Sequence, residues 1–231
     1  MKRHAIIVAG GRGVRMGADK PKQFLEIGGK PILRHTIERF LAFDPAIDLV
    51  LVLPADQREY WRAYCRETGF LDRYSMVSGG ITRFHSVQNA LAFVKGEGLV
   101  AVHDGVRPLV NTDLLARMYA AAEEYGAAVP VVPVVESVRK VEKDAAGKEV
   151  SAPVDREGLV VVQTPQVFRA GILQEAYRQP FRPSFTDDAS VVEAAGYAVQ
   201  LVPGARFNIK ITTPGDLSLA ASLLTISSSW T

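Results

Sequence analysis

The first segment of the sequence with residue types suited to phosphate chemistry is the loop 9–23, which reads AGGRGVRMGADKPKQ. Its glycines allow backbone amides to approach an anion closely. Four cations lie within the same loop, namely Arg12, Arg15, Lys20 and Lys22. The loop is neither a P-loop, since no Gly-Lys-Ser/Thr follows, nor a GxGxxG turn. We expect a triphosphate-binding loop rather than a solvated loop with incidental charge.

A second segment, VHDGVRP at 102–108, places an acid and a cation after an apolar run. A carboxylate at the end of a buried strand is suited to Mg²⁺, which uses few protein ligands and keeps phosphate oxygens and water. Asp104 is therefore a candidate metal ligand, and Arg107 a candidate for a substrate phosphate. The alternative is that Asp104 caps a turn and Arg107 pairs at the surface.

Two further segments carry polar residues whose role the spacing leaves open. Lys210 lies between two isoleucines in FNIKITTPGDL, where an alternating strand points it away from them, into a site or into solvent. In SGGITRFHSV, at 78–87, the glycine pair and Ser86 are suited to contacting a base or ribose. Thr212 or Thr213 is expected to cap a helix that Pro214 opens, and Asp187 and Asp188 are interpreted as caps. Neither His85 nor His103 has a serine or cysteine nucleophile in a G-x-S-x-G context.

These segments follow short apolar runs that alternate with helical periodicity. Buried strands are predicted at 5–9, 48–54 and 99–104, and further strands at 75–80, 127–135 and 197–203. Helices are predicted at 31–43, 55–68, 82–94, 112–125, 169–179, 187–195 and 214–224. Two prolines argue that the strand 127–135 is irregular or at an edge. The alternation implies a mostly parallel α/β sheet with helices on both faces and ligands beyond the carboxyl ends of the strands. Residues 136–162 carry no helical pattern and are predicted to form a β-arm, and 226–231 a frayed tail.

Composition narrows the class of protein further. A net charge of +2 gives no basic field for nucleic acid. A single cysteine, Cys65, excludes an internal disulfide, and the scattered histidines disfavour a zinc cluster. No apolar run approaches the ~20 residues needed to span a bilayer, and the N-terminal run is too short for a signal peptide. We expect one cytoplasmic α/β domain over residues 1–231, with no membrane partner.

Together these segments resemble the 2-C-methyl-D-erythritol 4-phosphate cytidylyltransferase family. The matching pieces are AGGRGVRMGADKPKQF, SGG with the following Arg and SV, VHDGVRP, DREGLVVVQTPQVF, FTDDAS and NIKITTPGDL. They stand in the family's order and span residues 5–217. The resemblance implies a Rossmann-like fold of the nucleotide-diphosphosugar transferase type, a homodimer interlocked through the arm, and Mg²⁺ as cofactor. The reaction implied is that of CTP with methylerythritol 4-phosphate, releasing pyrophosphate.

The resemblance also assigns roles to individual residues. Arg15, Lys22 and Lys210 match catalytic cations, and Asp104 matches a metal-associated aspartate that also contacts CTP. The expected CTP-binding set is Ala9, Gly10, Gly11, Gly13, Gly79, Gly80, Arg83, Ser86 and Asp104. The expected set for the sugar phosphate is Arg107, Thr164, Thr186, Lys210, Ser137 and Arg156, with Arg156 reaching the partner subunit's site.

Glu136-Ser137 departs from the family's usual Asp-Thr, which changes the reach of Ser137. Ribitol 5-phosphate cytidylyltransferase, a sister family, shares much of the motif set and is the alternative enzyme. A non-catalytic CTP sensor is the alternative from another class. The paired cations and Asp104 argue against the sensor, because binding alone does not require them on both sides of the α-phosphate.

Overall fold

The computed structural model describes residues 1–10, 20–70 and 74–227. Its centre is a sheet of eight strands linked by hydrogen bonds along the path β10-β7-β11-β6-β1-β4-β5, with β12 also paired to β7. The strands are β1 (Arg3–Val8), β4 (Asp48–Leu53), β5 (Tyr74–Ser78), β6 (Leu99–Asp104), β7 (Ala127–Pro133), β10 (Val160–Val162), β11 (Gln166–Arg169) and β12 (Gln200–Pro203). β1 is parallel to β4 and β6, whereas β10 and β11 run antiparallel to β7. The predicted mostly parallel sheet is confirmed.

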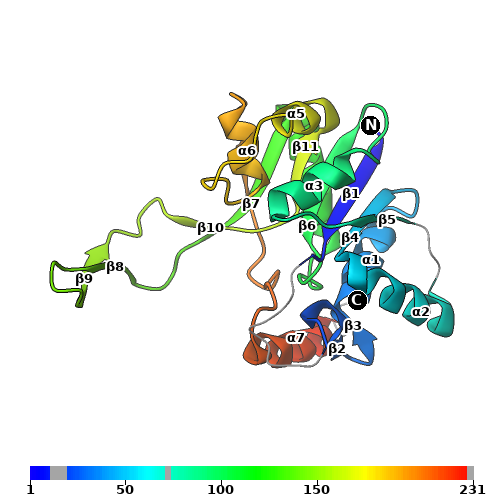
Figure 1. Cartoon of the computed structure of the whole chain (residues 1–231), viewed down its shortest axis with the longest axis horizontal. Helices are drawn as coiled ribbons and strands as arrows, with labels where there is room; N and C mark the ends of the chain where they lie inside the picture. The colour runs from blue at the N-terminus through cyan, green and yellow to red at the C-terminus, as the bar shows by residue number, and fades with distance from the viewer. Residues whose placement is uncertain (11–19, 71–73, 228–231) are drawn as a thin grey trace.

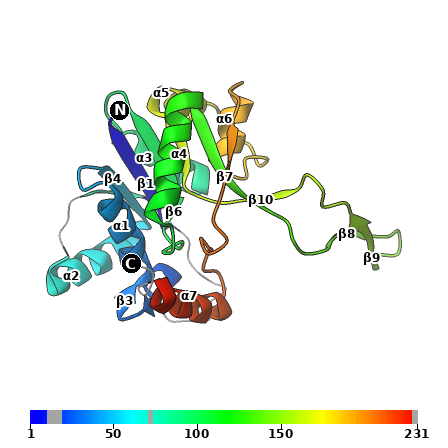
Figure 2. The same cartoon turned by 180° about the vertical axis from the view of Figure 1, so that it is seen from behind.

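Helices cover both faces of this sheet. They are α1 (Ile32–Phe43), α2 (Arg58–Thr68), α3 (Arg83–Leu91), α4 (Thr112–Tyr125), α5 (Ala170–Ala176) and α6 (Asp188–Ala194). α3 stands in front of the sheet in Figure 1 and α4 in Figure 2. Ile7 packs in one apolar core with residues of α1 and α4, and its neighbour Ile6 packs in another with residues of α3, α5 and α6. Because both faces are covered, the central strands read as continuous apolar runs.

A third, smaller core lies beyond the carboxyl ends of the parallel strands. It joins the hairpin of β2 (Glu26–Ile27) and β3 (Lys30–Pro31) to α7 (Pro214–Ser227), at the lower end of both views. Thr213 caps α7, since its Oγ1 accepts the amide of Asp216 at 3.2 Å, as expected. The tail predicted at 226–231 starts too early, because α7 continues to Ser227. Among the described helices, none combines the length and apolar character needed to cross a membrane.

The predicted arm leaves the body of the protein between β7 and β10. Its projecting part is a hairpin of β8 (Val138–Lys143) and β9 (Glu149–Val154), which Figures 1 and 2 show extended away from the sheet. The predicted end at 162 is wrong, because residues 160–162 form β10 and pair with β7. The arm is therefore anchored at both ends in one strand pair, at Pro133 and Val160.

Of the two alternatives for the strand from 127, irregular or at an edge, the edge position is wrong. Ala128 pairs with Val167 of β11 and with Gln200 of β12, so β7 has neighbours on both sides. β11 was not predicted at all. It is a short strand next to Pro165, and it follows β10 along the same side of β7 after a break at Gln163, Thr164 and Pro165.

Candidate active site

Two clefts adjoin each other where β1 and β6 end. The first has a volume of about 250 Å³ and is lined by Val8, Ala9, Gly10, Lys22, Gln23, Gly80, Ile81, Thr82, Arg83, Ser86, Asp104, Val106 and Lys210. The second, of about 260 Å³, is lined by Arg83, Asp104, Arg107, Val162, Gln163, Thr164, Gln166, Thr186, Asp187 and Lys210. Arg83, Asp104 and Lys210 belong to both. The structure thus joins residues from seven separate segments of the chain around a shared set of charges.

The glycine pair after β5 brings backbone against the first cleft. A Cβ on Gly80 would collide with the Cβ of His85, and one on Gly79 would lie 3.3 Å from the Oγ of Ser86. The amide of Gly80 donates to the Oγ of Ser86 at 3.0 Å, and that hydroxyl donates to the carbonyl of Thr82. The hydroxyl of Ser86 therefore stabilises the loop that lines the cleft.

Lys22 lies in the short helix η2 (Lys22–Phe24) at the edge of the first cleft. The next residue, Gln23, is buried, and its Nε2 donates to the carbonyl of Ala9 at 3.0 Å. The segment that carries Lys22 is thereby attached to the end of β1. Gly11, Gly13 and Arg15 belong to the stretch 11–19, outside the described residues.

Asp104 is the acidic centre of the two clefts. Its Oδ2 lies 3.0 Å from the Nζ of Lys210 and 3.2 Å from the Nε of Arg107, and its Oδ1 lies 4.0 Å from the Nε of Arg83. Burial alone would raise the pKa of this carboxyl, but the charges of Lys210, Arg83 and Arg107 outweigh it and hold the pKa well below its ordinary value. Asp104 is therefore a carboxylate surrounded by cations.

Arg83 is held from its far side by a buried acid that sequence reasoning missed. Its two terminal nitrogens donate to the carboxylate of Asp188 at 2.9 and 2.6 Å. Asp188 is fully buried and also accepts the hydroxyl of Tyr177 at 2.6 Å. The capping interpretation is right for Asp187, which caps α6, but wrong for Asp188. The FTDDAS segment gave the only signal, since an acid on the apolar face of a helix requires a partner.

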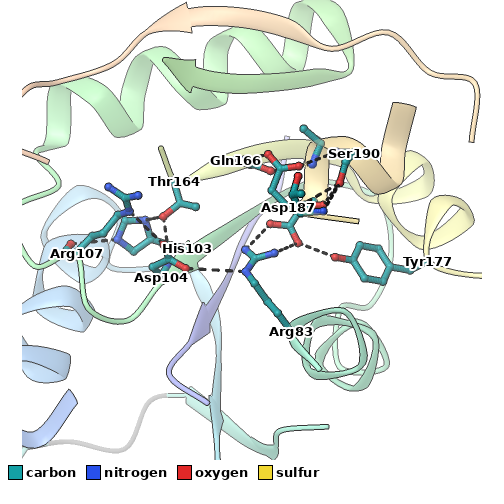
Figure 3. Close-up of polar contacts among 12 residues, drawn as sticks. Arg83, His103, Asp104, Arg107, Thr164, Gln166, Tyr177, Asp187 and Ser190 are labelled. Atoms are coloured by element: carbon teal, nitrogen blue, oxygen red, sulfur yellow. Dashed lines mark hydrogen bonds and ion pairs between the residues drawn. The ribbon is translucent and has the colours of Figure 1, made fainter. Parts of the chain in front are cut away.

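A second buried network surrounds Thr164, which stands in the break between β10 and β11. Its Oγ1 accepts the amide of Asp104 at 3.0 Å and lies 3.2 Å from the Nδ1 of His103 (Figure 3). The Nε2 of His103 lies 3.1 Å from the carbonyl oxygen of Arg107. Complete burial lowers the pKa of His103 to about 4, so its ring is neutral. Among the described residues, no serine or cysteine side chain hydrogen-bonds to this histidine.

The alternating strand considered for Lys210 is not formed, because residues 207–212 contain no strand. The segment is attached to the second cleft through Asn208, whose Nδ2 donates to the carbonyl of Thr164 at 2.8 Å. The carbonyl of Asn208 in turn accepts a terminal nitrogen of Arg107 at 2.8 Å. Arg107 is thus buried and bonded within the protein, in contrast to the alternative of a surface pair.

The remaining expected site residues fall into two groups. Thr186 lines the second cleft, and its amide donates to the Oγ of Ser190. Ser137 and Arg156 are exposed on the arm and line neither cleft within this chain. A side-chain nitrogen of Arg156 donates to the carbonyl of Val135.

The donor set at Asp104 fits a divalent cation that keeps most of its ligands from phosphate and water. Within the described residues, no cluster of three or more His, Cys, Asp or Glu could hold a metal without substrate. Oδ2 of Asp104 is engaged by Lys210 and Arg107, whereas Oδ1 accepts no hydrogen bond from the described residues. One carboxylate oxygen beside a phosphate site is the protein ligation that Mg²⁺ commonly uses.

Comparison with known proteins agrees with this arrangement. The crystal structure of 2-C-methyl-D-erythritol 4-phosphate cytidylyltransferase from Thermus thermophilus superposes with a TM-score of 0.75 at 35% identity, covering 96% of this chain and 98% of that one. The protein of the same name from Phocaeicola vulgatus is 54% identical over 224 residues, covering 97% of this chain and all of the relative. That from Porphyromonas gingivalis is 51% identical, covering 97% of this chain and 98% of the relative.

The fold is a mostly parallel α/β sheet, and its strand ends carry several cations around one carboxylate. Together with the similarity to these relatives, this arrangement defines the class of the protein, which is a nucleotidyltransferase. The family model of 2-C-methyl-D-erythritol 4-phosphate cytidylyltransferase matches residues 3–226. The chain belongs to that family.

Proposed function

We propose that this protein transfers CMP from CTP to 2-C-methyl-D-erythritol 4-phosphate, giving 4-diphosphocytidyl-2-C-methyl-D-erythritol and pyrophosphate, a step in isoprenoid precursor biosynthesis. The observation that carries the proposal is the pair of adjoining clefts that share Asp104, Arg83 and Lys210. A transfer between two phosphates needs one site for each, with cations at their junction.

CTP would occupy the first cleft. The close backbone approach at Gly10, Gly79 and Gly80 suits the base and ribose, and Lys22 and Lys210 suit the triphosphate. Arg15, Gly11 and Gly13 are proposed to complete the phosphate-binding loop. The acceptor would occupy the second cleft, beside Arg107, Thr164 and Thr186.

The reaction is an in-line displacement at the α-phosphorus. An oxygen of the acceptor's phosphate forms a bond to that phosphorus, and the bond to the bridging oxygen of pyrophosphate breaks. The nucleophile is already an anion, so the protein need not supply a general base. Its task is to place two polyanions together and to stabilise the developing charge, which Lys22 and Lys210 do from opposite sides of the α-phosphate.

Mg²⁺ is proposed as cofactor, with Asp104 as its protein ligand. When bound, it neutralises phosphate charge and orients the triphosphate. Asp104 stays ionised for this role because Lys210, Arg83 and Arg107 lower its pKa.

A homodimer through the arm is part of the proposal. The arm exposes Val141 and Val150, and the anchoring strand β10 exposes its three valines. Apolar side chains on an extended hairpin favour a cover of protein. Ser137 and Arg156, which line neither cleft of their own chain, would then serve the acceptor cleft of the partner.

The first experiment measures pyrophosphate release with CTP and Mg²⁺, in parallel with methylerythritol 4-phosphate and ribitol 5-phosphate. Rapid release with the first acceptor alone is expected, and release with ribitol 5-phosphate alone would overturn the assignment. Lys22→Met and Lys210→Met should each lower kcat by about 10²–10³. Lys95→Met, at an exposed lysine that lines neither cleft, is the matched control.

The dimer is tested by mixing two inactive variants, Arg156→Ala and Lys210→Met, after unfolding and refolding them together. If Arg156 serves the partner's site, half of the dimers are mixed, and one of their two sites is intact. About a quarter of the wild-type activity should then return, by the geometry of a twofold dimer. No recovery, or a monomer in sedimentation, would contradict the proposed arrangement.

A further inference from the structure

His103, at the end of β6, is fully buried beside Thr164 and Arg107, which line the second cleft, and it has no role in the reaction described above. Each ring nitrogen has one polar partner among the described residues. Nε2 faces the carbonyl oxygen of Arg107 at 3.1 Å, and Nδ1 faces the hydroxyl of Thr164 at 3.2 Å (Figure 3). The ring also lies edge-on to Phe40, with centroids 5.1 Å apart, so its orientation is fixed by packing.

Donor and acceptor chemistry determines where the protons are in this network. A carbonyl oxygen only accepts, so Nε2 must carry the ring's hydrogen. A neutral imidazole has one N–H, so Nδ1 is an acceptor and the hydroxyl of Thr164 donates to it. The amide of Asp104 donates to the same hydroxyl oxygen at 3.0 Å. The only hydroxyl proton of Thr164 and one of its two lone pairs are therefore used inside the protein.

We propose that His103 is a positioning residue of the acceptor cleft: its Nε2–H tautomer turns the hydroxyl proton of Thr164 inward and leaves Thr164 able only to accept a hydrogen bond from the acceptor substrate. The assignment of this cleft to the acceptor rests on the proposed function. A phosphate oxygen cannot pair with such a hydroxyl, because neither has a hydrogen to give. The group that hydrogen-bonds Thr164 is a substrate hydroxyl, and the phosphate goes to the cations.

The same ring also holds the turn that carries the charged groups. Asp104 begins this turn and Arg107 ends it. The Nδ1 of His103 accepts the hydroxyl of Thr164, which itself accepts the amide of Asp104, and the Nε2 of His103 donates to the carbonyl of Arg107. The terminal nitrogen of Arg107 reaches Asn208, two residues before Lys210. His103 thus helps to set Arg107 and Thr164 relative to Asp104 without touching a substrate.

The tautomer is measured directly on the substrate-free protein by ¹⁵N NMR of labelled histidine side chains. The chain has four histidines, and His103→Gln identifies the signals of His103 by their loss. At neutral pH we expect a protonated Nε2 and an unprotonated Nδ1. A protonated Nδ1 would overturn the proposal. This result does not depend on which reaction the protein catalyses, so it separates failure of the inference from failure of the proposed function.

Kinetics with two variants test the role in the acceptor cleft. Asparagine places its amide near the position of Nδ1 and glutamine near that of Nε2, so His103→Asn keeps an acceptor for Thr164 while His103→Gln keeps a donor for Arg107. We expect His103→Gln to raise the KM for the acceptor about tenfold, with the KM for CTP changed less than about twofold. His103→Asn should keep the acceptor KM within about threefold of the wild type. Equal effects of both variants, or a parallel rise in both KM values, would indicate a merely structural role.

Thr164→Val provides the second arm of the test. If His103 acts through Thr164, adding His103→Gln to Thr164→Val raises the acceptor KM no further. Multiplying effects would refute the coupling. His35→Gln is the matched control, because the Nε2 of His35 also lies on a carbonyl oxygen, that of Ile27 at 2.7 Å, and His35 lines neither cleft.

Discussion

Replacing Asp188 by asparagine removes the buried counter-charge of Arg83 and tests how this part of the site is stabilised. Asp188 is fully buried and accepts three hydrogen bonds, two from Arg83 and one from Tyr177. Asparagine keeps the volume, but it presents an amide N–H₂ to groups that are themselves donors. Removing one partner of a buried pair costs about 3–5 kcal/mol. The Arg83 side chain is 29% exposed, so we expect a destabilisation at the lower end of this range, about 3 kcal/mol.

This loss corresponds to a fall in Tm of about 6–12 °C for a domain of this size. Differential scanning calorimetry measures it, and urea unfolding gives an independent value. Tyr177→Phe removes only one donor and should fall between wild type and Asp188→Asn. The control Asp113→Asn breaks the exposed pair with Arg117 and should shift Tm by less than about 3 °C. A shift as small as the control's for Asp188→Asn would refute the reasoning that this pair stabilises the fold.

Two further predictions concern the glycine loop and the dependence of stability on pH. Gly80→Ala should weaken CTP binding at least tenfold, because the new Cβ collides with that of His85 and displaces the loop. Calorimetry measures this binding. The control is Gly171→Ala, where nothing lies within 4 Å of the added carbon, and it should leave binding unchanged. Burial lowers the pKa of His4 and of His35 below the 6.5 of an exposed histidine. The unfolded chain then binds more protons than the folded one, so stability holds above pH 6.5 and falls as the pH drops below it. Melting curves from about pH 5 to 8 should show this slope, and an unchanged slope in His35→Gln would contradict the contribution of His35.

The central strands were predictable because burial on both faces leaves an unmistakable apolar run. β1, β4 and β6 follow the predicted ranges closely, and Asp104 was singled out because it ends such a run. β11 escaped prediction because four residues beside a proline give too short a pattern. The error over β7 has a related cause, since prolines mark an edge only on average. Ala128 of this strand has partners on both sides.

The features of the site likewise fall into those that local sequence predicts and those that it does not. Several of the residues that line the clefts, such as Asp104 and Gly80, stand at strand ends or in glycine loops, which local sequence reveals. The contacts that hold them are long-range: Arg83 and Asp188 are 105 positions apart, and His103 and Thr164 are 61 apart. No local pattern encodes such pairs, and an acid near a helix start resembles a cap whether it faces water or a buried arginine. The partners were therefore visible only once the chain was folded.

The arm returns to the sheet through β10, so the register of β10 on β7 fixes where Thr164 lies in the acceptor cleft. Val162 pairs with Val131, the amide of the next residue donates to the carbonyl of Pro130, and Thr164 follows directly. Residues added at the tip of the arm, near Gly147, lie beyond both anchors and leave this count untouched. One residue added within β10 would turn each following side chain to the opposite face and move Thr164 from His103. The tip of the arm is thus free to change in length and composition. The number of residues in its returning strand, Val160–Val162, is fixed.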